Sequence, residues 1–564
     1  METLIKNIAC KNCQQNFEIT NLDQQFYEKM HVPEPTFCPD CRQQRRLMWR
    51  NERTLYKRKC SATGKEIISV YSEDKPFPVY ENEYWYSDKW NPMDYGVDFD
   101  FSRPFFEQFK ELMNRVPQLA RSAVSNQNCD YINQAGYCKN CYLIFEADSD
   151  ENCMYSTNIY DSRFCLDVLE CYNCELCYEA ISCDNSYNLK FSRNCKNCSD
   201  SFFLRNCIGC KNCFGCVNLA SKEYYFLNQK CTKEEYEEKL QKVLPKNRNE
   251  IESLEKNFKE FCLKFPQKNL EGVQNEDSTG DHLSHTQRCK NCYNLHHAQD
   301  CKFVFNSSNT KNCYDLTVFG YKPIEFCYEN HEVGVNCQNI RFCDQVWEGC
   351  YDMTYSKLCL KNCHDLFGCI GLRHKSYCIL NKQYTPEEYK ILVEKIIEHL
   401  RAPASAGGGK QTQEWGEFFP ANLAFYGYNE TNAQDHFPLK KEEALKKGYK
   451  WKDLDPKEYK PQNYQVPAAI KDIPDSIINE VLACQTCKKN YKIIQEELSF
   501  YKKQNLPIPL NCPDCRHKNR FKSYNPRKLY SRNCQKCNIE IQTTFAPAMP
   551  EIVYCEKCYL EALS

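Results

Sequence analysis

The chain has 564 residues, 42 of which are cysteine, and its formal net charge at pH 7 is −1. Hydrophobic residues make up 42% and charged residues 26%, so the chain can bury packed cores and is not disordered as a whole. The near-neutral charge by itself indicates neither a nucleic-acid partner nor a membrane surface. The length predicts several domains rather than one.

The first residues, METLIKNIACKNC, contain no apolar core of a secretory signal. No run of residues approaches the ~18 apolar positions that a transmembrane helix needs. We therefore expect a cytoplasmic protein that does not enter a membrane. In a reducing compartment metal binding is a more common role for paired cysteines than disulfide formation.

The two ends of the chain carry the same cysteine motif. Cys10-x2-Cys13 is followed after 24 residues by Cys38-Pro-Asp-Cys41, and the same pattern recurs exactly 474 positions later in the C-terminal region. Two thiolate pairs of this spacing complete a closed tetrahedral zinc site, which has no open position for a reacting water. The repeated spacing predicts an internally duplicated zinc ribbon with a structural metal.

A further motif follows the C-terminal copy, with two more C-x2-C pairs that predict a third zinc ion. The N-terminal copy has Cys60, Thr63, Glu81 and Tyr84 at the corresponding positions, so we expect it to keep the ribbon backbone without a metal. The cofactor prediction is therefore three zinc ions. The predicted ligands are Cys10, Cys13, Cys38, Cys41, Cys484, Cys487, Cys512, Cys515, Cys534, Cys537, Cys555 and Cys558.

A basic stretch follows each C-P-D-C motif. Clustered arginine with interleaved aromatic residues is typical of surfaces that contact phosphates and stack on bases. A solvated face or an intramolecular docking surface is the alternative interpretation. The candidate nucleic-acid-binding residues are Arg42, Arg45, Arg46, Arg50, Arg53, Arg516, Lys518, Arg520, Lys522 and Arg527.

The central region repeats every twelve residues from Asn128 onwards. At every third position from 129 to 219 the residue is small or apolar, with Asp150 as the one charged exception. A period of three fits neither an α-helix nor a simple strand. It predicts a narrow solenoid whose chain turns every few residues and points one side chain inward per side. A thin interior explains the many Cys, Ser and Ala residues at these positions.

This pattern resembles the twelve-residue right-handed β-helix of beetle antifreeze proteins. The Thr-x-Thr ladder that the resemblance would require for ice binding is missing, so only the fold carries over. The disulfide of that family is available only at Cys165/Cys171 and Cys177/Cys183. We expect mostly free thiols that pack as small apolar groups. Soft-metal binding by stacked cysteines, such as Cys171 and Cys183, remains an alternative.

The solenoid pattern resumes near Cys289 and ends in the same way as the first copy, at an offset of 153. Both copies run into a capping box that predicts a helix, Thr232…Glu235 and Thr385…Glu388. His282, His285, Cys289 and Cys292 have the spacing of a further metal site, but a polar loop entering the first coil is the stronger interpretation.

Taken whole, the chain resembles the double zinc-ribbon proteins of bacterial lineages with reduced genomes. The resemblance rests on Cys38-Pro-Asp-Cys-Arg42, Arg50-Asn-Glu-Arg53, Asp100-Phe-Ser-Arg-Pro-Phe-Phe-Glu-Gln-Phe109 and Gly427-Tyr-Asn-Glu-Thr431. It spans most of the chain and implies zinc ribbons at both ends. It supplies no mechanism to transfer.

The predicted fold class is mainly β and multidomain, with zinc ribbons flanking two short Cys-rich right-handed β-helix segments that end in capping helices. The predicted domains are 1–100 (zinc ribbon and metal-free pseudo-ribbon), 101–127 (helical connector), 128–230 (first solenoid), 231–286 (helices and loop), 287–384 (second solenoid), 385–401 (capping helix), 402–478 (linker and aromatic-rich connector) and 479–564 (double zinc ribbon). The linker in this list is the segment Ala402 to Lys410.

The sequence favours a non-catalytic scaffold that binds nucleic acid or a ribonucleoprotein through its basic zinc ribbons. A protein–protein adaptor without nucleic acid is the first alternative, and a metal-storage or redox protein that uses the stacked cysteines is the second. No phosphate-binding loop, nucleophile signature or open three-ligand zinc motif is present, so we expect no enzyme and no small-molecule substrate. We expect protein partners under each of these three hypotheses.

Overall fold

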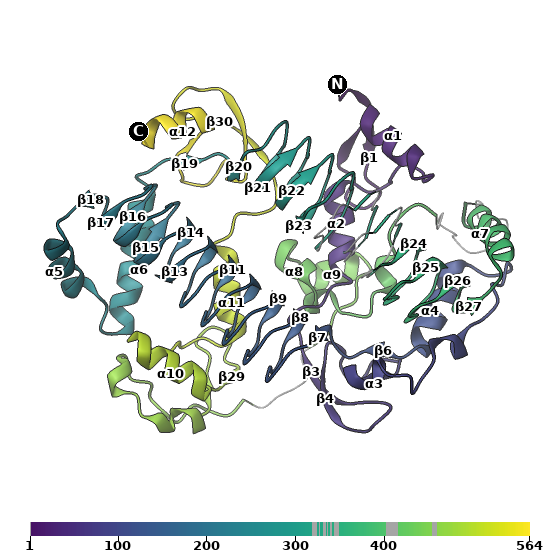
Figure 1. Ribbon diagram of the computed structural model, residues 1–564, viewed down its shortest axis with the longest axis horizontal. Helices are drawn as coiled ribbons and strands as arrows, with labels where there is room; N and C mark the ends of the chain where they lie inside the picture. Colours follow the sequence, from purple (N-terminus) through teal and green to yellow (C-terminus); the bar gives the residue numbers. More distant parts are fainter. Residues whose placement is uncertain are drawn as a thin grey trace. The chain divides into compact units, whose positions relative to one another are not determined.

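The computed structural model describes residues 2–318, 349–401, 415–453 and 459–563, together with positions 324, 325, 328–330, 334, 337, 338, 341, 342 and 344. The predicted Ala402–Lys410 linker lies outside the described residues, as do Cys327 and Cys343. The chain divides into two compact units, 1–121 with 270–452, and 122–269 with 453–564. Each unit therefore combines one terminal module with one repeat segment. The N-terminal module belongs with the second repeat, and the C-terminal module with the first (Figure 1).

The described residues form a mixed α/β structure rather than the mainly β one expected. Helices are more abundant than the sequence suggested because each cysteine module contributes several of its own. The helices are α1 (Asn21–Lys29), α2 (Pro39–Leu47), α3 (Asn82–Trp85), α4 (Phe105–Arg115), α5 (Lys233–Val243), α6 (Arg248–Cys262), α7 (Pro386–Arg401), α8 (Asn432–His436), α9 (Lys441–Lys446), α10 (Gln495–Gln504), α11 (Pro513–Lys522) and α12 (Glu556–Leu563). Short 3-10 turns lie at η1 (Pro92–Tyr95), η2 (Ala421–Leu423), η3 (Tyr428–Glu430), η4 (Ile470–Asp472) and η5 (Asp475–Asn479).

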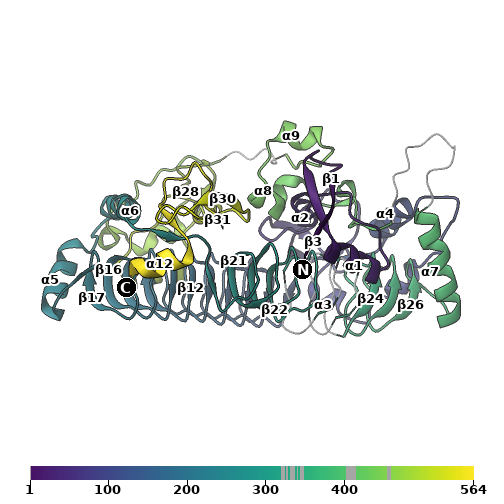
Figure 2. The ribbon, with the colours of Figure 1, turned by 90° about the horizontal axis from the view of Figure 1, so that it is seen from above.

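The first repeat segment, residues 122–230, forms a mostly parallel 12-stranded sheet. Each strand from β7 to β16 pairs in parallel with the chain twelve residues further on, so that Ile159 lies beside Ala147 and Cys171, whereas β17 and β18 pair antiparallel. Its strands are β7 (Ala123–Val124), β8 (Asn133–Gly136), β9 (Phe145–Asp148), β10 (Thr157–Tyr160), β11 (Leu169–Tyr172), β12 (Ile181–Asp184), β13 (Tyr187–Lys190), β14 (Arg193–Lys196), β15 (Ser199–Arg205), β16 (Lys211–Val217), β17 (Glu223–Phe226) and β18 (Gln229–Lys230). Figure 2 shows these strands stacked as successive rungs.

The second repeat segment, residues 270–383, contains two four-stranded sheets that are mostly parallel, with β26 and β27 antiparallel and with partners 11 to 13 residues apart in the parallel pairs. The first sheet comprises β20 (Gly272–Val273), β21 (Gly280–Gln287), β22 (Cys292–Gln299) and β23 (Phe305–Ser308). The second comprises β24 (Tyr351–Thr354), β25 (His364–Phe367), β26 (Ser376–Ile379) and β27 (Lys382–Gln383).

Small two-stranded sheets complete the cysteine modules and the segments that lead into the repeats. In the first unit they comprise β1 (Leu4–Ala9), β2 (Asn16–Thr20), β3 (Tyr56–Lys59), β4 (Glu66–Ser69), β5 (Val79–Tyr80) and β6 (Gln118–Leu119). In the second unit they comprise β19 (Gln267–Lys268), β28 (Leu482–Ala483), β29 (Asn490–Tyr491), β30 (Tyr530–Asn533), β31 (Glu540–Thr543) and β32 (Val553–Tyr554).

The period of three has a backbone cause. From Asn128 to Asn206 every third residue has a φ near +50°, so the chain turns at each of these positions in the left-handed conformation. The residue after each turn points inward, which gives the buried column at every third position. Asparagine tolerates the left-handed region better than most residues. It recurs at these turns, for example at Asn194 and Asn206, whose side chains hydrogen-bond to each other across 3.2 Å.

Thiols and hydroxyls fill the thin interior and also satisfy backbone groups there. The Cys174 Sγ–H lies 3.5 Å from the Tyr172 carbonyl and 3.2 Å from the Cys183 carbonyl. Ser162 occupies an equivalent position and donates to the Tyr160 carbonyl across 3.1 Å. All described cysteines are free, which confirms the expectation of mostly free thiols. These small side chains pack beside larger interior residues such as Ile159 and Leu204, and unlike them can hydrogen-bond to backbone groups.

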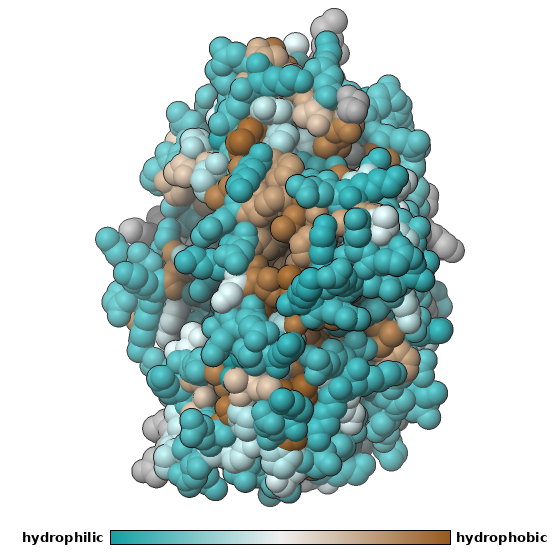
Figure 3. Space-filling model, turned by 90° about the vertical axis from the view of Figure 1, so that its left-hand side faces the viewer, coloured by the Kyte–Doolittle hydropathy of each residue, from teal (hydrophilic) through white to brown (hydrophobic). Residues whose placement is uncertain are grey.

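Helices close the C-terminal end of each repeat segment. Thr232 caps α5 through the predicted capping box with Glu235, and Thr385 and Glu388 form the same box at the start of α7. Tyr236 of α5 packs with Phe214 in an apolar cluster on the last strands. Figure 3 views the side that carries α5 and shows hydrophobic surface framed by hydrophilic side chains. Within the predicted helical connector, α4 begins at Phe105 with Pro104 as its N-cap.

The left-handed turns predict a position-specific effect of β-branched substitutions. Asn185 is exposed and has a φ of 46°, whereas Tyr187, two residues on, is exposed within β13. We expect Asn185→Val to destabilise the first repeat by about 1–2 kcal/mol, because valine is strained at positive φ. Tyr187→Val should change stability by less than about 0.5 kcal/mol. Urea unfolding of both variants checks the difference, and equal effects would contradict the assignment of residue 185 as a turn.

Candidate metal centres

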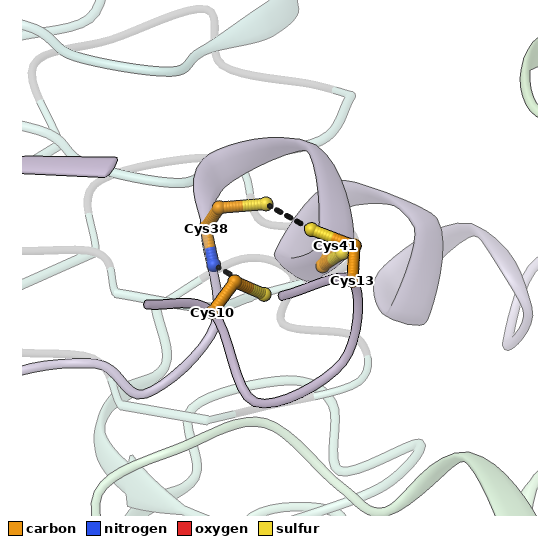
Figure 4. Close-up of side chains that lie close together, drawn as sticks. All are labelled: Cys10, Cys13, Cys38 and Cys41. Carbon is orange, nitrogen blue, oxygen red and sulfur yellow. Dashed lines mark hydrogen bonds between the residues drawn. The ribbon is translucent and has the colours of Figure 1, made fainter. Parts of the chain in front are cut away.

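The first four-cysteine group lies at the start of the chain, where a β-turn and a helix meet. The Sγ atoms of Cys10, Cys13, Cys38 and Cys41 all lie within 4.8 Å of one another (Figure 4). The turn is closed by two backbone hydrogen bonds, from Cys10 to the Gln15 carbonyl at 2.9 Å and from Gln14 to the Cys10 carbonyl at 2.9 Å. The backbone N–H of Cys38 donates to Cys10 Sγ across 3.2 Å. Such a turn points both thiols of its C-x2-C pair at one centre.

Two more groups of the same kind lie in the C-terminal module. Cys484, Cys487, Cys512 and Cys515 form one, and the other comprises Cys534, Cys537, Cys555 and Cys558. In both, the turn repeats the hydrogen bonds of the first, for example from Cys534 to the Ile539 carbonyl at 2.8 Å. The three groups contain all twelve predicted ligands, and among the described residues no other group of this type was found.

Four thiolates at this separation fit a zinc ion. A tetrahedron with Zn–S near ~2.3 Å places its sulfurs about 3.8 Å apart. The observed separations of 3.7 Å for Cys13–Cys38, 3.6 Å for Cys487–Cys512 and 3.8 Å for Cys537–Cys555 match that value. When bound, the ion would crosslink a turn to a helix. With all four positions taken by thiolates it offers no site for a substrate.

Each centre begins a helix with its second cysteine pair. Cys38 is the N-cap of α2 and Cys512 the N-cap of α11, each with proline at the first helical position. A zinc ribbon would instead place this pair on a second β-turn, so the ribbon assignment is corrected to a turn-plus-helix arrangement. The signal was present in the sequence, because proline followed by aspartate is typical of a first helical turn.

The first cysteine of each centre is prepared for the thiolate form. Burial raises its pKa, but backbone N–H groups that point at the sulfur outweigh burial. They lower the pKa of Cys10 to about 7, that of Cys484 to about 6 and that of Cys534 to about 6. A thiolate is the form that binds metal, so each centre has one cysteine whose surroundings favour the metal-binding form.

The N-terminal module also contains a fourth turn of the same shape. Cys60 donates its N–H to the Lys65 carbonyl at 2.8 Å, and Gly64 donates to the Cys60 carbonyl at 2.9 Å. The Glu81 N–H lies 3.3 Å from Cys60 Sγ, as the second pair does in the metal centres. Thr63 donates its hydroxyl hydrogen to Glu81 Oε1 across 2.7 Å where the metal would bind. A side-chain hydrogen bond thus replaces the ion.

The basic residues of the N-terminal module are largely buried against the second repeat segment. Arg42 pairs with Asp315 at 2.8 Å, and Arg46 reaches the same carboxylate at 3.1 Å. Arg45 pairs with Glu329 and with Glu417. Asp315 is fully buried, so the two guanidiniums supply the compensation that a buried carboxylate requires.

The C-terminal module repeats this arrangement on the first repeat segment. Arg516 pairs with Asp167 at 2.6 Å and Arg520 pairs with the other oxygen of the same carboxylate at 2.8 Å. Arg516 also stacks on the Tyr155 ring at 4.4 Å and donates from Nη1 to Glu497 Oε1 across 3.1 Å. The two modules therefore dock through equivalent arginines, 474 residues apart, on aspartates that are 148 residues apart.

The remaining basic candidates are divided between packed and exposed positions. Arg50 is buried beside Glu52, Arg53 is half-buried, and Arg527 lies 3.8 Å from Glu170. Lys518 and Lys522, on α11, are exposed. Six of the ten candidates (Arg42, Arg45, Arg46, Arg50, Arg516 and Arg520) are at most 5% exposed and contact acidic residues of their own unit.

The aspartates that receive these arginines were not singled out in the sequence. Asp167 and Asp315 occupy equivalent positions of two coils, in Cys165-Leu-Asp-Val168 and Cys313-Tyr-Asp-Leu316. The same aspartate recurs in both repeat segments, and the same arginine pair recurs in both modules. This joint recurrence in the sequence could have identified the aspartates as partners of the arginines. The alternative interpretation of the basic stretches as an intramolecular docking surface is confirmed for the five arginines that pair with acidic residues outside their own module, which are Arg42, Arg45, Arg46, Arg516 and Arg520.

Comparison with known proteins supports the metal assignment. Residues 6–48 match the family model described as a probable treble clef domain, a zinc-binding module. The match covers the first centre and α2, which follows its second cysteine pair. No curated protein matches the chain. No helix among the described residues is long and apolar enough to cross a membrane.

The equivalence of the four turns predicts that a lost metal site can be restored. Thr63→Cys, Glu81→Cys and Tyr84→Cys together place thiols at the positions of Cys537, Cys555 and Cys558 around the retained turn of Cys60. Native mass spectrometry should count four zinc ions in this variant and three in the parent protein. The control variant carries Cys512→Ser and Cys515→Ser, which remove two ligands of an existing centre, and it should bind two zinc ions. A triple variant that still holds three ions would contradict the equivalence.

Proposed function

We propose that the protein is a non-catalytic, zinc-stabilised scaffold whose repeat segments are narrow β-solenoids that present a regular surface to a protein partner. The treble clef modules serve this scaffold by docking on the solenoids through their arginines. The observation that carries the proposal is the burial of these arginines against Asp167 and Asp315, which gives the modules an internal structural role.

Support for the solenoid comes from parallel pairing on more than one side of each coil. Besides the strands, isolated bridges join Lys139 to Glu151 and Tyr142 to Met154, again at a spacing of twelve. Residues that are twelve apart are therefore neighbours on several sides. A right-handed β-helix, as in the antifreeze resemblance, is consistent with this pattern and is part of the proposal.

One column of the first repeat segment is suited to a partner. Lys139, Arg163, Glu175 and Lys211 are exposed and lie at multiples of twelve residues, so their backbones are separated by multiples of the ~4.8 Å spacing of paired strands. Lys139 and Glu151 lie 3.7 Å apart and more than a third exposed. Exposed charges fixed on a rigid lattice can select a complementary surface without prior ordering of the chain.

Nucleic acid remains a second candidate partner, supported by the exposure of Lys518 and Lys522 on one helix. Two lysines supply few phosphate contacts, so the dependence of such binding on salt should be shallow. An enzymatic role has no support in the three closed four-cysteine groups, because a closed tetrahedron leaves no coordination position for chemistry.

The proposal is tested by comparing partner capture from native lysate by three forms of the full-length protein. The column variant carries Lys139→Glu, Arg163→Glu and Lys211→Glu, and the control carries Lys233→Glu and Lys242→Glu on exposed positions of α5. We expect the parent and the control to recover the same proteins after nuclease treatment. The column variant should recover these proteins in amounts at least about tenfold lower.

Two outcomes would contradict the proposal. Recovery by the column variant at the parental level would remove this surface as the binding face. Loss of every partner on nuclease treatment would favour the nucleic-acid candidate. In that case Lys518→Ala with Lys522→Ala should weaken RNA binding at low salt.

A further inference from the structure

The segments that lead into the two repeats are held in the same way. Gln118 donates its N–H to the Pro78 carbonyl at 2.9 Å, and Ala120 donates to the Tyr80 carbonyl at 3.0 Å. In the second unit Gln267 donates to the Ile552 carbonyl at 2.7 Å, and Asn269 donates to the Tyr554 carbonyl at 2.9 Å. Each pair forms a short parallel ladder, β5 with β6 and β32 with β19. We call them the first and the second entry clamp.

Each entry clamp is attached directly to a cysteine turn. In the second clamp Gln535, within the Cys534–Cys537 turn, donates its N–H to the Val553 carbonyl at 3.1 Å. Val553 donates in return to Gln535 Oε1 across 2.6 Å. In the first clamp Ser61 exchanges the same two hydrogen bonds with Val79, at 2.8 and 3.0 Å. The strand that holds each entry segment is thus fixed by the turn beside it.

The two clamps differ in what holds the turn to the helix. In the first clamp the Thr63–Glu81 hydrogen bond does so. In the second clamp Cys534, Cys537, Cys555 and Cys558 surround the position of a zinc ion, and β32 runs directly into Cys555. The first clamp therefore needs no metal, whereas in the second a zinc ion bound to the four sulfurs would crosslink the turn to the helix.

The second clamp is also accessible to small reagents. Among the described cysteines Cys537 is the one that is exposed, whereas Cys13 and Cys487 at the corresponding places of the other two centres are only half-exposed. Cys537 Sγ lies 3.8 Å from Cys555 Sγ. An exposed thiolate with a second thiolate at that distance can be oxidised to a disulfide with small side-chain movements.

We propose that the Cys534–Cys537–Cys555–Cys558 centre is a peroxide-sensitive zinc latch that controls the second entry clamp, with Cys537 as the modified residue. The Cys537 thiolate attacks hydrogen peroxide, the O–O bond breaks, and a sulfenic acid and hydroxide form. The Cys555 thiolate then attacks the sulfenic sulfur, an S–S bond forms and a second hydroxide leaves. Two electrons pass from the two sulfurs to peroxide, and the zinc ion, having lost two of its four ligands, dissociates.

The consequence concerns residues 267–269, which belong to the second unit. The chain leaves the second unit after Asn269, the last residue of the second entry clamp. Loss of zinc frees the turn that positions Val553, and β32 no longer presents its carbonyls to Gln267 and Asn269. Asn218 still holds the Pro266 carbonyl at 2.8 Å, so the segment before the clamp stays in place and the opening is confined to residues 267–269.

The test uses the zinc-loaded full-length protein treated with increasing hydrogen peroxide. Native mass spectrometry counts the ions, differential alkylation identifies the oxidised cysteines, and hydrogen exchange follows individual amides. We expect loss of the first zinc ion to coincide with the protection of Cys537 and Cys555 from alkylation. At that point the Gln267 and Asn269 amides should exchange at least about tenfold faster, while the Gln118 and Ala120 amides keep their rates.

Variants separate the latch from general damage. Cys537→Ser should open the second clamp without peroxide and bind two ions. Cys60→Ser, at the equivalent turn of the metal-free clamp, should leave the ion count and the rates of Gln118 and Ala120 unchanged. Loss of an ion from the Cys10 or Cys484 centre before the third would overturn the proposal. Unchanged exchange at Gln267 and Asn269 after the third centre has emptied would do the same.

Discussion

A buried aspartate between two arginines fixes each cysteine module to its repeat segment. Asp167 meets Arg516 and Arg520, and Asp315 meets Arg42 and Arg46, with all six side chains almost completely buried. A buried ion cluster adds little net stability, because desolvation offsets most of the Coulombic attraction. Removing one partner is nevertheless costly, since it leaves an uncompensated charge. The cluster therefore dictates where the module can sit more than how strongly it is held.

The two clusters are similar enough that a module could in principle dock on either repeat segment. Arg45 supplies a difference, because it pairs with Glu329 and Glu417 in the first unit. The corresponding residue of the C-terminal module is Asn519, which carries no charge. Docking of the C-terminal module at the second repeat would leave Glu329 buried without a cation, and that mismatch disfavours the exchange.

Local patterns in the sequence were enough to find the metal centres, the twelve-residue period and the capping boxes. Each of these depends on residues within one turn, one coil or one helix end. The destination of the arginines depends on aspartates about 270 and 350 residues away in the chain, and a run of positive charge looks the same whether it faces water or a buried carboxylate. The proline after Cys38 is typical of a first helical turn, and asparagine tolerates the left-handed conformation of the repeated turns.

The cysteines serve two purposes that geometry keeps apart. Twelve of the 42 cysteines converge in three centres of four, each built from a turn and a helix. In the third centre, backbone N–H groups favour the thiolate form of Cys534. Inside the repeat segments burial raises the pKa of Cys171 and Cys195, and the thiols donate to backbone carbonyls. These interior thiols pack in columns, whereas the twelve cysteines of the three groups have the geometry of a metal site.

The buried aspartate and its arginines couple each module to its repeat segment, and a double-mutant cycle measures this coupling directly. Asp167→Asn, Arg520→Gln and the double variant are compared through native-state hydrogen exchange at the amides of β11, which reports the opening free energy of this region of the full chain. We expect each single substitution to cost about 3 kcal/mol or more and the double to cost less than their sum by about 2 kcal/mol. Additive costs, within about 0.5 kcal/mol, would contradict the docking cluster.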